Sequence, residues 1–137
     1  MNSPVRVDED LFDFDDDVRL YQGKPFTGIA FGQYPNSRLK RELPYKDGFP
    51  EGLCREWHSN GQLEREWFAL RGRAVGKFKE WYENGAIHSI GEYEYGVEMR
   101  YEQWDITGKK IIDREIGTDS TLYDYVQALR TREVRKS

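Results

Sequence analysis

Most of this chain consists of extended runs in which apolar and polar residues alternate, separated by short turns. Residues 77–82 alternate in this way, a Glu-Asn-Gly turn follows at 83–85, and residues 87–95 form a second extended run. Because side chains alternate across a β-strand, this pattern predicts an antiparallel hairpin. The same arrangement occurs 24 residues earlier, from Gly52 to Gly72. A repeat of roughly 20 to 50 residues is typical of arrays in which each unit packs on its neighbours.

Glycines and tryptophans at equivalent positions mark the repeat. Two blocks, which begin at Gly52 and Gly76, match well. A block that begins at Gly28 lacks the tryptophan, and a last block keeps its tryptophan but shortens the interval to 23 residues. The residues that we assign to the structural repeat are Gly52, Trp57, Gly61, Gly76, Trp81, Gly85, Trp104 and Gly108.

The Asn-Gly pairs predict how the hairpins turn. In Asn60-Gly61 and Asn84-Gly85 both residues tolerate the positive φ of a type I′ turn, which is the turn expected here. Successive hairpins should then form one elongated antiparallel sheet. Trp57, Trp81 and Trp104 should share a face, where we expect their rings to stack as a cross-strand ladder.

Neither face of this sheet should be purely apolar. Alternation places Arg55 and Lys79 on the face of the repeat tryptophans, and Cys54 and Phe78 on the opposite face. The composition agrees, with 34% charged, 37% hydrophobic and 15% aromatic residues. The fold class that we predict is therefore mainly β, a single-layer sheet of hairpins with a C-terminal helix.

The two ends of the chain differ from the repeats at 19–117. Residues 1–18 hold seven carboxylates between positions 8 and 17, which predicts an acidic N-terminal arm that is mobile or loosely docked through its aromatic residues. Residues 118–137 place apolar side chains at helical spacing, so we expect an amphipathic helix that caps the exposed last hairpin. The apolar residues of this helix are Leu122, Tyr125, Val126 and Leu129.

Charge and cysteine content limit the binding partners and the cellular location that we expect. A net charge of −4 and a pI near 5.3 disfavour a general nucleic-acid or anionic-membrane surface, since both require basic residues. No apolar run approaches the roughly 18 residues that span a bilayer, and the N-terminus lacks a signal pattern. The single cysteine forms no internal disulfide. We expect a cytoplasmic protein.

Catalytic chemistry has little support in the sequence. On one strand Cys54 and His58 would lie about 13 Å apart, too far for a hydrogen bond. Together with His88 they also make a poor metal site. Glutamates that recur at the repeat period indicate cross-strand charge ladders rather than a catalytic pair, and they are Glu42, Glu56, Glu66 and Glu80. We expect no enzymatic activity, no metal and no cofactor.

The block Gly-x4-Trp-x2-Asn-Gly, followed by an apolar position and a Tyr-rich stretch to another glycine, resembles the MORN repeat. It is most similar to the variant form found in bacterial antitoxin proteins of the YwqK type, and Tyr21–Gly28 resembles the lead-in of that group. The resemblance covers about residues 20–112. It implies a hairpin array for protein–protein contact, often in antitoxins or immunity proteins, while eukaryotic relatives are linked to membranes and scaffolding. It supplies no catalytic residue.

These observations predict a bacterial antitoxin or immunity protein that neutralises a cognate toxin by occluding its surface. The alternatives are a scaffold that docks a partner enzyme and an aromatic-lined carbohydrate or small-ligand binder, and self-association stays open. Trp67 and Phe68 depart from the repeat, so packing alone does not explain them and they are candidate contact residues. Acidic residues of the N-terminal arm would mimic phosphate against a basic partner. They are Asp13, Asp15, Asp16 and Asp17.

Overall fold

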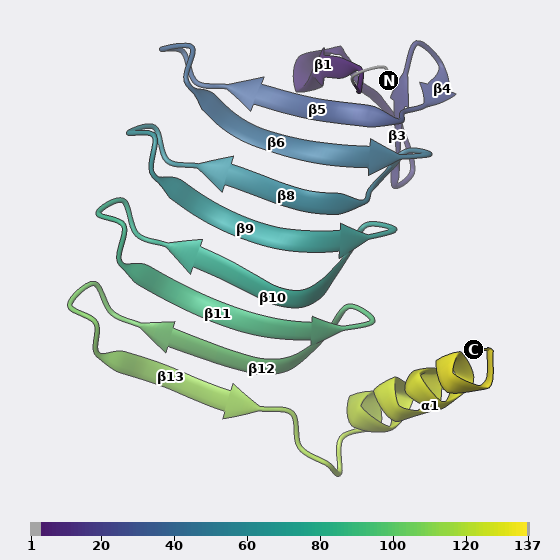
Figure 1. Cartoon of the computed structure of the whole chain (residues 1–137), viewed down its shortest axis with the longest axis vertical. Coiled ribbons are helices and arrows are strands. Elements are labelled where there is room, and N and C mark those ends of the chain that lie inside the picture. Colours follow the sequence, from purple (N-terminus) through teal and green to yellow (C-terminus); the bar gives the residue numbers. More distant parts are fainter. Residues whose placement is uncertain (1–3, 137) are drawn as a thin grey trace.

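A computed structural model describes residues 4–136, with only the backbone for residue 136, and consists of one long twisted sheet, a small second sheet and a helix (Figure 1). Residues 1–3 of the expected arm and residue 137 of the expected helical segment lie outside the described residues. The prediction of a mainly β, elongated, hairpin-based fold with one C-terminal helix is confirmed.

The main sheet runs in the order β1-β5-β6-β8-β9-β10-β11-β12-β13, and β7 pairs with β6 beside this path. All its pairs are antiparallel except β1 with β5, which is parallel. Its strands are β1 (Arg6–Asp8), β5 (Gly28–Gln33), β6 (Leu39–Lys46), β7 (Phe49–Pro50), β8 (Gly52–Trp57), β9 (Leu63–Leu70), β10 (Arg73–Trp81), β11 (Ile87–Glu94), β12 (Val97–Trp104) and β13 (Lys110–Glu115). The remaining elements are η1 (Glu9–Leu11), the small sheet of β2 (Asp13–Asp15), β3 (Val18–Tyr21) and β4 (Lys24–Pro25), and α1 (Thr121–Lys136).

The Asn-Gly turns lie where they were expected, but their type is different. In the turn of residues 58–62 the Gly61 N–H donates to the His58 carbonyl at 2.9 Å, and the His58 N–H donates to the Gln62 carbonyl at 2.8 Å. Gly61 has a φ of 91°, whereas Asn60 has no positive φ. This is a three-residue loop with its glycine in the left-handed region. The prediction of type I′ turns at Asn-Gly is therefore wrong, because the asparagine accepts a backbone N–H two residues on instead.

Paired positive φ values occur at the opposite end of the hairpins. Each connection there has a non-glycine residue near φ 50° followed by glycine, as in Arg71 (50°) and Gly72 (81°) or Tyr95 (51°) and Gly96 (78°). Positive φ at both central residues is the signature of a type I′ turn. The turns at the two ends of the strands are thus of different types, and each type forms its own column along the sheet (Figure 1).

Neighbouring hairpin units are joined by a repeated side-chain hydrogen bond. The Tyr34 hydroxyl donates to the Trp57 carbonyl at 2.6 Å, and the Tyr82 hydroxyl donates to the Trp104 carbonyl at 2.9 Å. His58 occupies the equivalent position between them, with its Nε2 at 2.7 Å from the Trp81 carbonyl. The Asn60 side chain adds a bond to the Glu83 carbonyl at 2.9 Å. One column of turns is therefore fastened unit to unit.

The strand register defines two faces. Face A carries the paired series Arg55, Glu66 and Lys79, and face B carries Cys54, Trp67 and Phe78. The predicted division of side chains between the faces is therefore confirmed.

The predicted tryptophan ladder is wrong. Trp57 is paired with Leu63, and Trp81 with Ile87, so an aliphatic side chain of the intervening strand separates successive rings. Strands lie about 4.8 Å apart, which places rings two strands apart beyond stacking distance.

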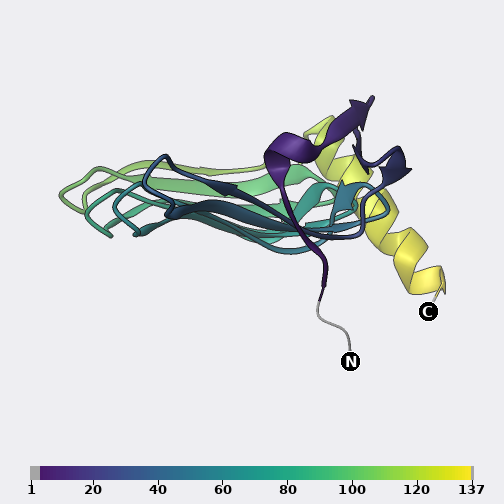
Figure 2. The ribbon, with the colours of Figure 1, turned by 90° about the horizontal axis from the view of Figure 1, so that it is seen from above.

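The N-terminal segment packs on face B. The buried core contains Val7, Phe26, Ala30 and Tyr45, with Phe12 packed against it. The Glu9 carboxylate of η1 accepts from Arg41 of β6 at 2.9 Å. Figure 2 shows η1 and the small sheet on one side of the main sheet. The described part of residues 1–18 is thus docked through its apolar side chains, and the mobility of this segment stays a prediction.

Helix α1 begins after Ser120, whose hydroxyl accepts the Leu122 N–H at 3.2 Å and which is therefore the N-cap. Val126 is fully buried, but Leu122 and Tyr125 are 54% and 45% exposed. The expected stripe is thus only partly covered. The helix also leaves the β13 edge open, because it lies at the turns, where Arg130 pairs with Glu94 (Figure 1).

The positive-φ glycine of the three-residue loops gives a test of the repeat. Gly85 has a φ of 87°, so the Gly85→Ala variant should lose about 1–2 kcal/mol of unfolding free energy through backbone strain. The control Glu83→Ala alters an exposed residue of the same turn and should change it by less than about 0.5 kcal/mol. Urea unfolding of both variants measures the difference, and equal stabilities would contradict this account of the turn.

Candidate protein-binding surface

A row of aromatic side chains crosses face B from β9 to β12. Trp67 is paired with Phe78, Phe78 with Gly91, and Gly91 with Tyr101. The Trp67 and Phe78 rings stack with centroids 4.9 Å apart and planes 14° from parallel. The Tyr93 ring meets the Phe78 ring edge-on at 6.2 Å. The four aromatic residues, Trp67, Phe78, Tyr93 and Tyr101, are called the aromatic row below.

Gly91 is what allows the row to be continuous. A Cβ at this position would lie 2.7 Å from the Tyr93 ring, closer than real Cβ contacts. Because glycine has no side chain, the Tyr93 ring fills this gap between Phe78 and the next strand.

The aromatic row is half-buried rather than covered. Burial and the nearby Glu98 carboxylate raise the pKa of the Tyr93 phenol. The Arg114 guanidinium lies 4.4 Å from the Tyr101 ring centroid and is held by two hydrogen bonds to Glu98, each 2.9 Å. Large aromatic surface next to a fixed charge is the composition of protein-binding hot spots.

A charge ladder runs beside the row on the same face. Arg41 contacts Glu9 at 2.9 Å and Glu56 at 3.3 Å, and Arg65 contacts Glu56 at 3.3 Å and Glu80 at 3.6 Å. The expectation that the recurring glutamates form cross-strand ladders is met at these positions. Since each charge has a partner, this ladder supports the sheet rather than offering free charge.

Four further candidate residues lie in β2 and the turn after it. Asp13, Asp15, Asp16 and Asp17 are exposed, and none of them forms an ion pair within residues 4–135. The Arg19 guanidinium lies over the rings of Phe12, Phe14 and Tyr45 instead, which fixes the base of this acidic turn on face B. The acidic turn therefore presents uncompensated carboxylates on the side of the sheet that carries the aromatic row.

Phe68 is not part of this surface. It follows Trp67 in β9, so its side chain points to face A, where it is 49% exposed and paired with Leu53 and Val75. The six residues singled out in the sequence are thus divided, with Trp67 and the aspartates on one side and Phe68 on the other. Tyr93 and Tyr101 could not be grouped with Trp67 from alternation alone, because the pairing of β9 with β10 shifts by two residues at Gly76 and Lys77.

The cysteine and the histidines have structural contacts. Cys54 is fully buried, and burial raises the pKa of its thiol to about 12. The His58 ring contacts the Trp81 carbonyl and lies 3.4 Å from Glu64, while the His88 ring packs edge-on against Tyr82 at 4.7 Å. Among the described residues, no three His, Cys, Asp or Glu side chains are grouped so that they could hold a metal ion.

The match to a known protein family coincides with two of the hairpin units. The family described as MORN repeat variant matches residues 50–68 and 74–95, which are the β8–β9 and β10–β11 hairpins with their flanking residues. Two hairpin units of this chain match the MORN repeat. MORN repeats generally act as protein- or membrane-interaction modules. No curated protein and no solved structure matches the chain.

The matched segments contain three residues of the aromatic row, Trp67 in the first and Phe78 and Tyr93 in the second, whereas Tyr101 lies outside them. Within the described residues, no helix is long and apolar enough to cross a bilayer.

The Cys54 thiol should be inert in the folded protein. Because its pKa is about 12 and the side chain is fully buried, the reactive thiolate is scarce at pH 8. We expect a disulfide reagent to label it at least roughly a hundredfold more slowly than in the urea-unfolded chain. Equal rates in the two states would contradict the buried position of this residue.

Proposed function

We propose that this protein is a non-enzymatic binding module that recognises a protein partner through face B. The observation that carries the proposal is the aromatic row, four half-buried rings from four adjacent strands of one sheet. Aromatic anchors on a rigid scaffold bind with little loss of conformational entropy. MORN-type repeats as interaction modules are consistent with this role.

The partner that we propose is a toxin with a basic surface, which makes this chain an antitoxin or immunity protein. The acidic turn supports this choice, because four exposed aspartates without ion-pair partners in the described chain provide a strong local negative field. Complementary charge of this kind accelerates association and orients the partner. The aromatic row would then supply the short-range contact that keeps the toxin surface covered.

The first experiment is a tagged pull-down of the full chain from cells that express it naturally, at low and moderate salt, followed by mass spectrometry. A single stoichiometric partner should co-elute, and adding the purified chain should inhibit that partner's activity. A partner that co-elutes but keeps its activity indicates a scaffold. Capture of no protein, together with glycan binding that needs Trp67, would replace the proposal with the carbohydrate-binding alternative.

Neutralising the acidic turn should slow binding. In the variant D13N/D15N/D16N/D17N we expect the association rate with the partner to fall about tenfold at low salt, with little change in dissociation. The matched control D47N/E83Q/E115Q/D119N removes four exposed carboxylates elsewhere and should bind at nearly the wild-type rate. Stopped-flow or biosensor kinetics give both rates, and an unchanged association rate at low salt would exclude a role for the acidic turn.

Removing the first ring of the aromatic row should weaken the complex. We expect Trp67→Ala to reduce affinity for the partner by at least about tenfold. Trp104→Ala removes a half-buried tryptophan from face A and should leave affinity within about threefold. Titration calorimetry, below the unfolding temperature of both variants, makes the comparison. Equal losses would place the contact elsewhere.

A further inference from the structure

Face A carries an apolar strip that residues 4–135 leave partly exposed. Leu53 is paired with Phe68, and Phe68 with Val75, so three apolar side chains lie side by side on β8, β9 and β10. Leu70 lies two residues beyond Phe68 on the same face. Their exposed fractions are 45% for Leu53, 49% for Phe68, 49% for Leu70 and 38% for Val75. We call these four residues the apolar strip.

Helix α1 also has an apolar surface that is only partly covered. Only Val126 of its apolar residues is buried. Leu122 and Tyr125, with exposed fractions of 54% and 45%, lie with Leu129 on one side of the helix and form the helix stripe. The helix is held by other groups. Arg130 donates to Glu94 at 2.6 Å, and a hydrogen bond between Tyr95 and Glu133 raises the pKa of Tyr95 to about 12.

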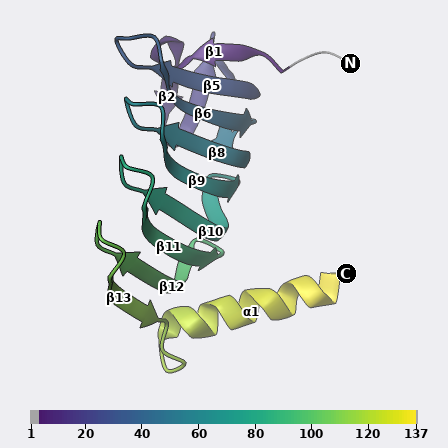
Figure 3. The ribbon, with the colours of Figure 1, turned by 60° about the vertical axis from the view of Figure 1, so that its left-hand side comes forward.

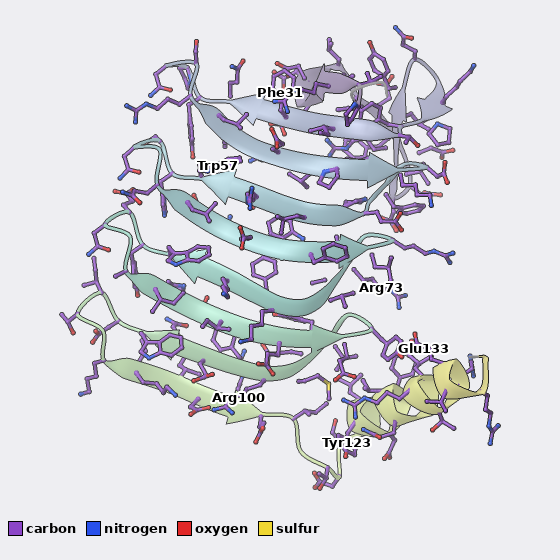
Figure 4. All side chains as sticks on the ribbon, in the orientation of Figure 1. Phe31, Trp57, Arg73, Arg100, Tyr123 and Glu133 are labelled. Carbon is purple, nitrogen blue, oxygen red and sulfur yellow. The ribbon has the colours of Figure 1, made fainter. Side chains whose placement is uncertain are left out.

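The helix passes the turns at one end of the strands, and its C-terminal half reaches beyond face A (Figure 2). Figures 2 and 3 show α1 running past the sheet, toward the side opposite η1. A groove of about 570 Å³ separates the helix from the sheet and is lined by the strip residues Leu70 and Val75 on one side and by Glu133 on the other. Arg73 and Glu133 mark its two walls in Figure 4. Sheet and helix thus form an open corner next to the apolar strip.

We propose that a second copy of this chain fills the corner, with the helix stripe of each copy packed on the apolar strip of the other. A sheet face and an amphipathic helix are both stable only when their apolar sides are covered, and here one chain supplies both halves of a helix-on-sheet layer. A reciprocal exchange about a twofold axis closes on itself, so it gives a dimer and not a polymer.

The buried area supports the dimer. With full areas near the lower end of the roughly 150–250 Å² of aromatic side chains, the exposed parts of the strip and stripe amount to at most about 500 Å² in each copy. Because each copy contributes both surfaces, the dimer buries up to about 1,000 Å² of apolar area before any polar rim is counted, which is the lower limit of a specific interface. The helix stripe and the apolar strip also have the same length. The stripe from Leu122 to Leu129 spans about 10 Å along the helix, and the strip crosses three strands, which span about 10 Å across the sheet.

The inference does not rest on the proposed function, which uses face B. It is tested by sedimentation equilibrium of the full chain at concentrations up to about 100 μM. We expect a reversible monomer–dimer equilibrium. L122S/Y125S and Phe68→Ser should each weaken dimerisation at least about tenfold. The matched control I106S/I111S changes two exposed apolar residues of the last hairpin, at the strand ends opposite α1, and should dimerise as the wild type does.

Cross-linking then identifies the contact. A Tyr125→Cys copy mixed with a Phe68→Cys copy should form a mixed disulfide under mild oxidation, whereas an Ile106→Cys copy mixed with Phe68→Cys should not. Cys54 is buried and does not interfere. A wild-type chain that stays monomeric at the highest concentration would overturn the proposal. So would a dimer that L122S/Y125S leaves intact, because the contact would then lie elsewhere, for example at the open β13 edge.

Discussion

A hydrogen bond from one hairpin unit to the backbone of the next determines how this molecule is put together. The Tyr34 and Tyr82 hydroxyls and the His58 ring each bind the carbonyl of the tryptophan that ends the corresponding strand one unit later. This bond aligns successive turns in a column. The backbone pairing of neighbouring strands sets the spacing of the units, and the side-chain bond adds a second link between units that each contact only their neighbours.

Because the long sheet is a single layer, both of its faces carry ion pairs and exposed apolar side chains. With no opposing sheet, charged side chains on each face pair across strands, as Arg41, Glu56 and Arg65 do on face B and as Arg55 and Glu66 do on face A. The N-terminal segment covers face B only where Tyr45 and Ala30 form the core. Beyond that core the aromatic row stays half-exposed, and on face A the apolar strip has no cover within the described chain.

The repeat period was sufficient to predict the hairpins and the long sheet, alternation predicted the division of side chains between faces, and the helical spacing of residues 118–137 predicted the C-terminal helix. These patterns were not sufficient to predict contacts that depend on register. The tryptophan rings were expected to stack, but Leu63 and Ile87 lie between them. Turn type failed for a related reason, since Asn60 and Asn84 use their side chains to accept backbone N–H groups and so need no positive φ. The aromatic row required the shift at Gly76, which alternation alone does not reveal.

Positions that break the repeat are therefore more informative about function than positions that keep it. The glycines of the three-residue loops are explained by their positive φ, and Tyr34 and Tyr82 by the bonds between units. Trp67 and Phe68 depart from the repeat, and as neighbours in one strand they project to opposite faces, where Trp67 begins the half-buried aromatic row and Phe68 lies in the apolar strip. The one departure from the repeat in β9 therefore places an aromatic side chain on each face of the sheet. In the two proposals one scaffold binds a protein partner on face B and a second copy of this chain on face A, and neither contact involves the bonds between units.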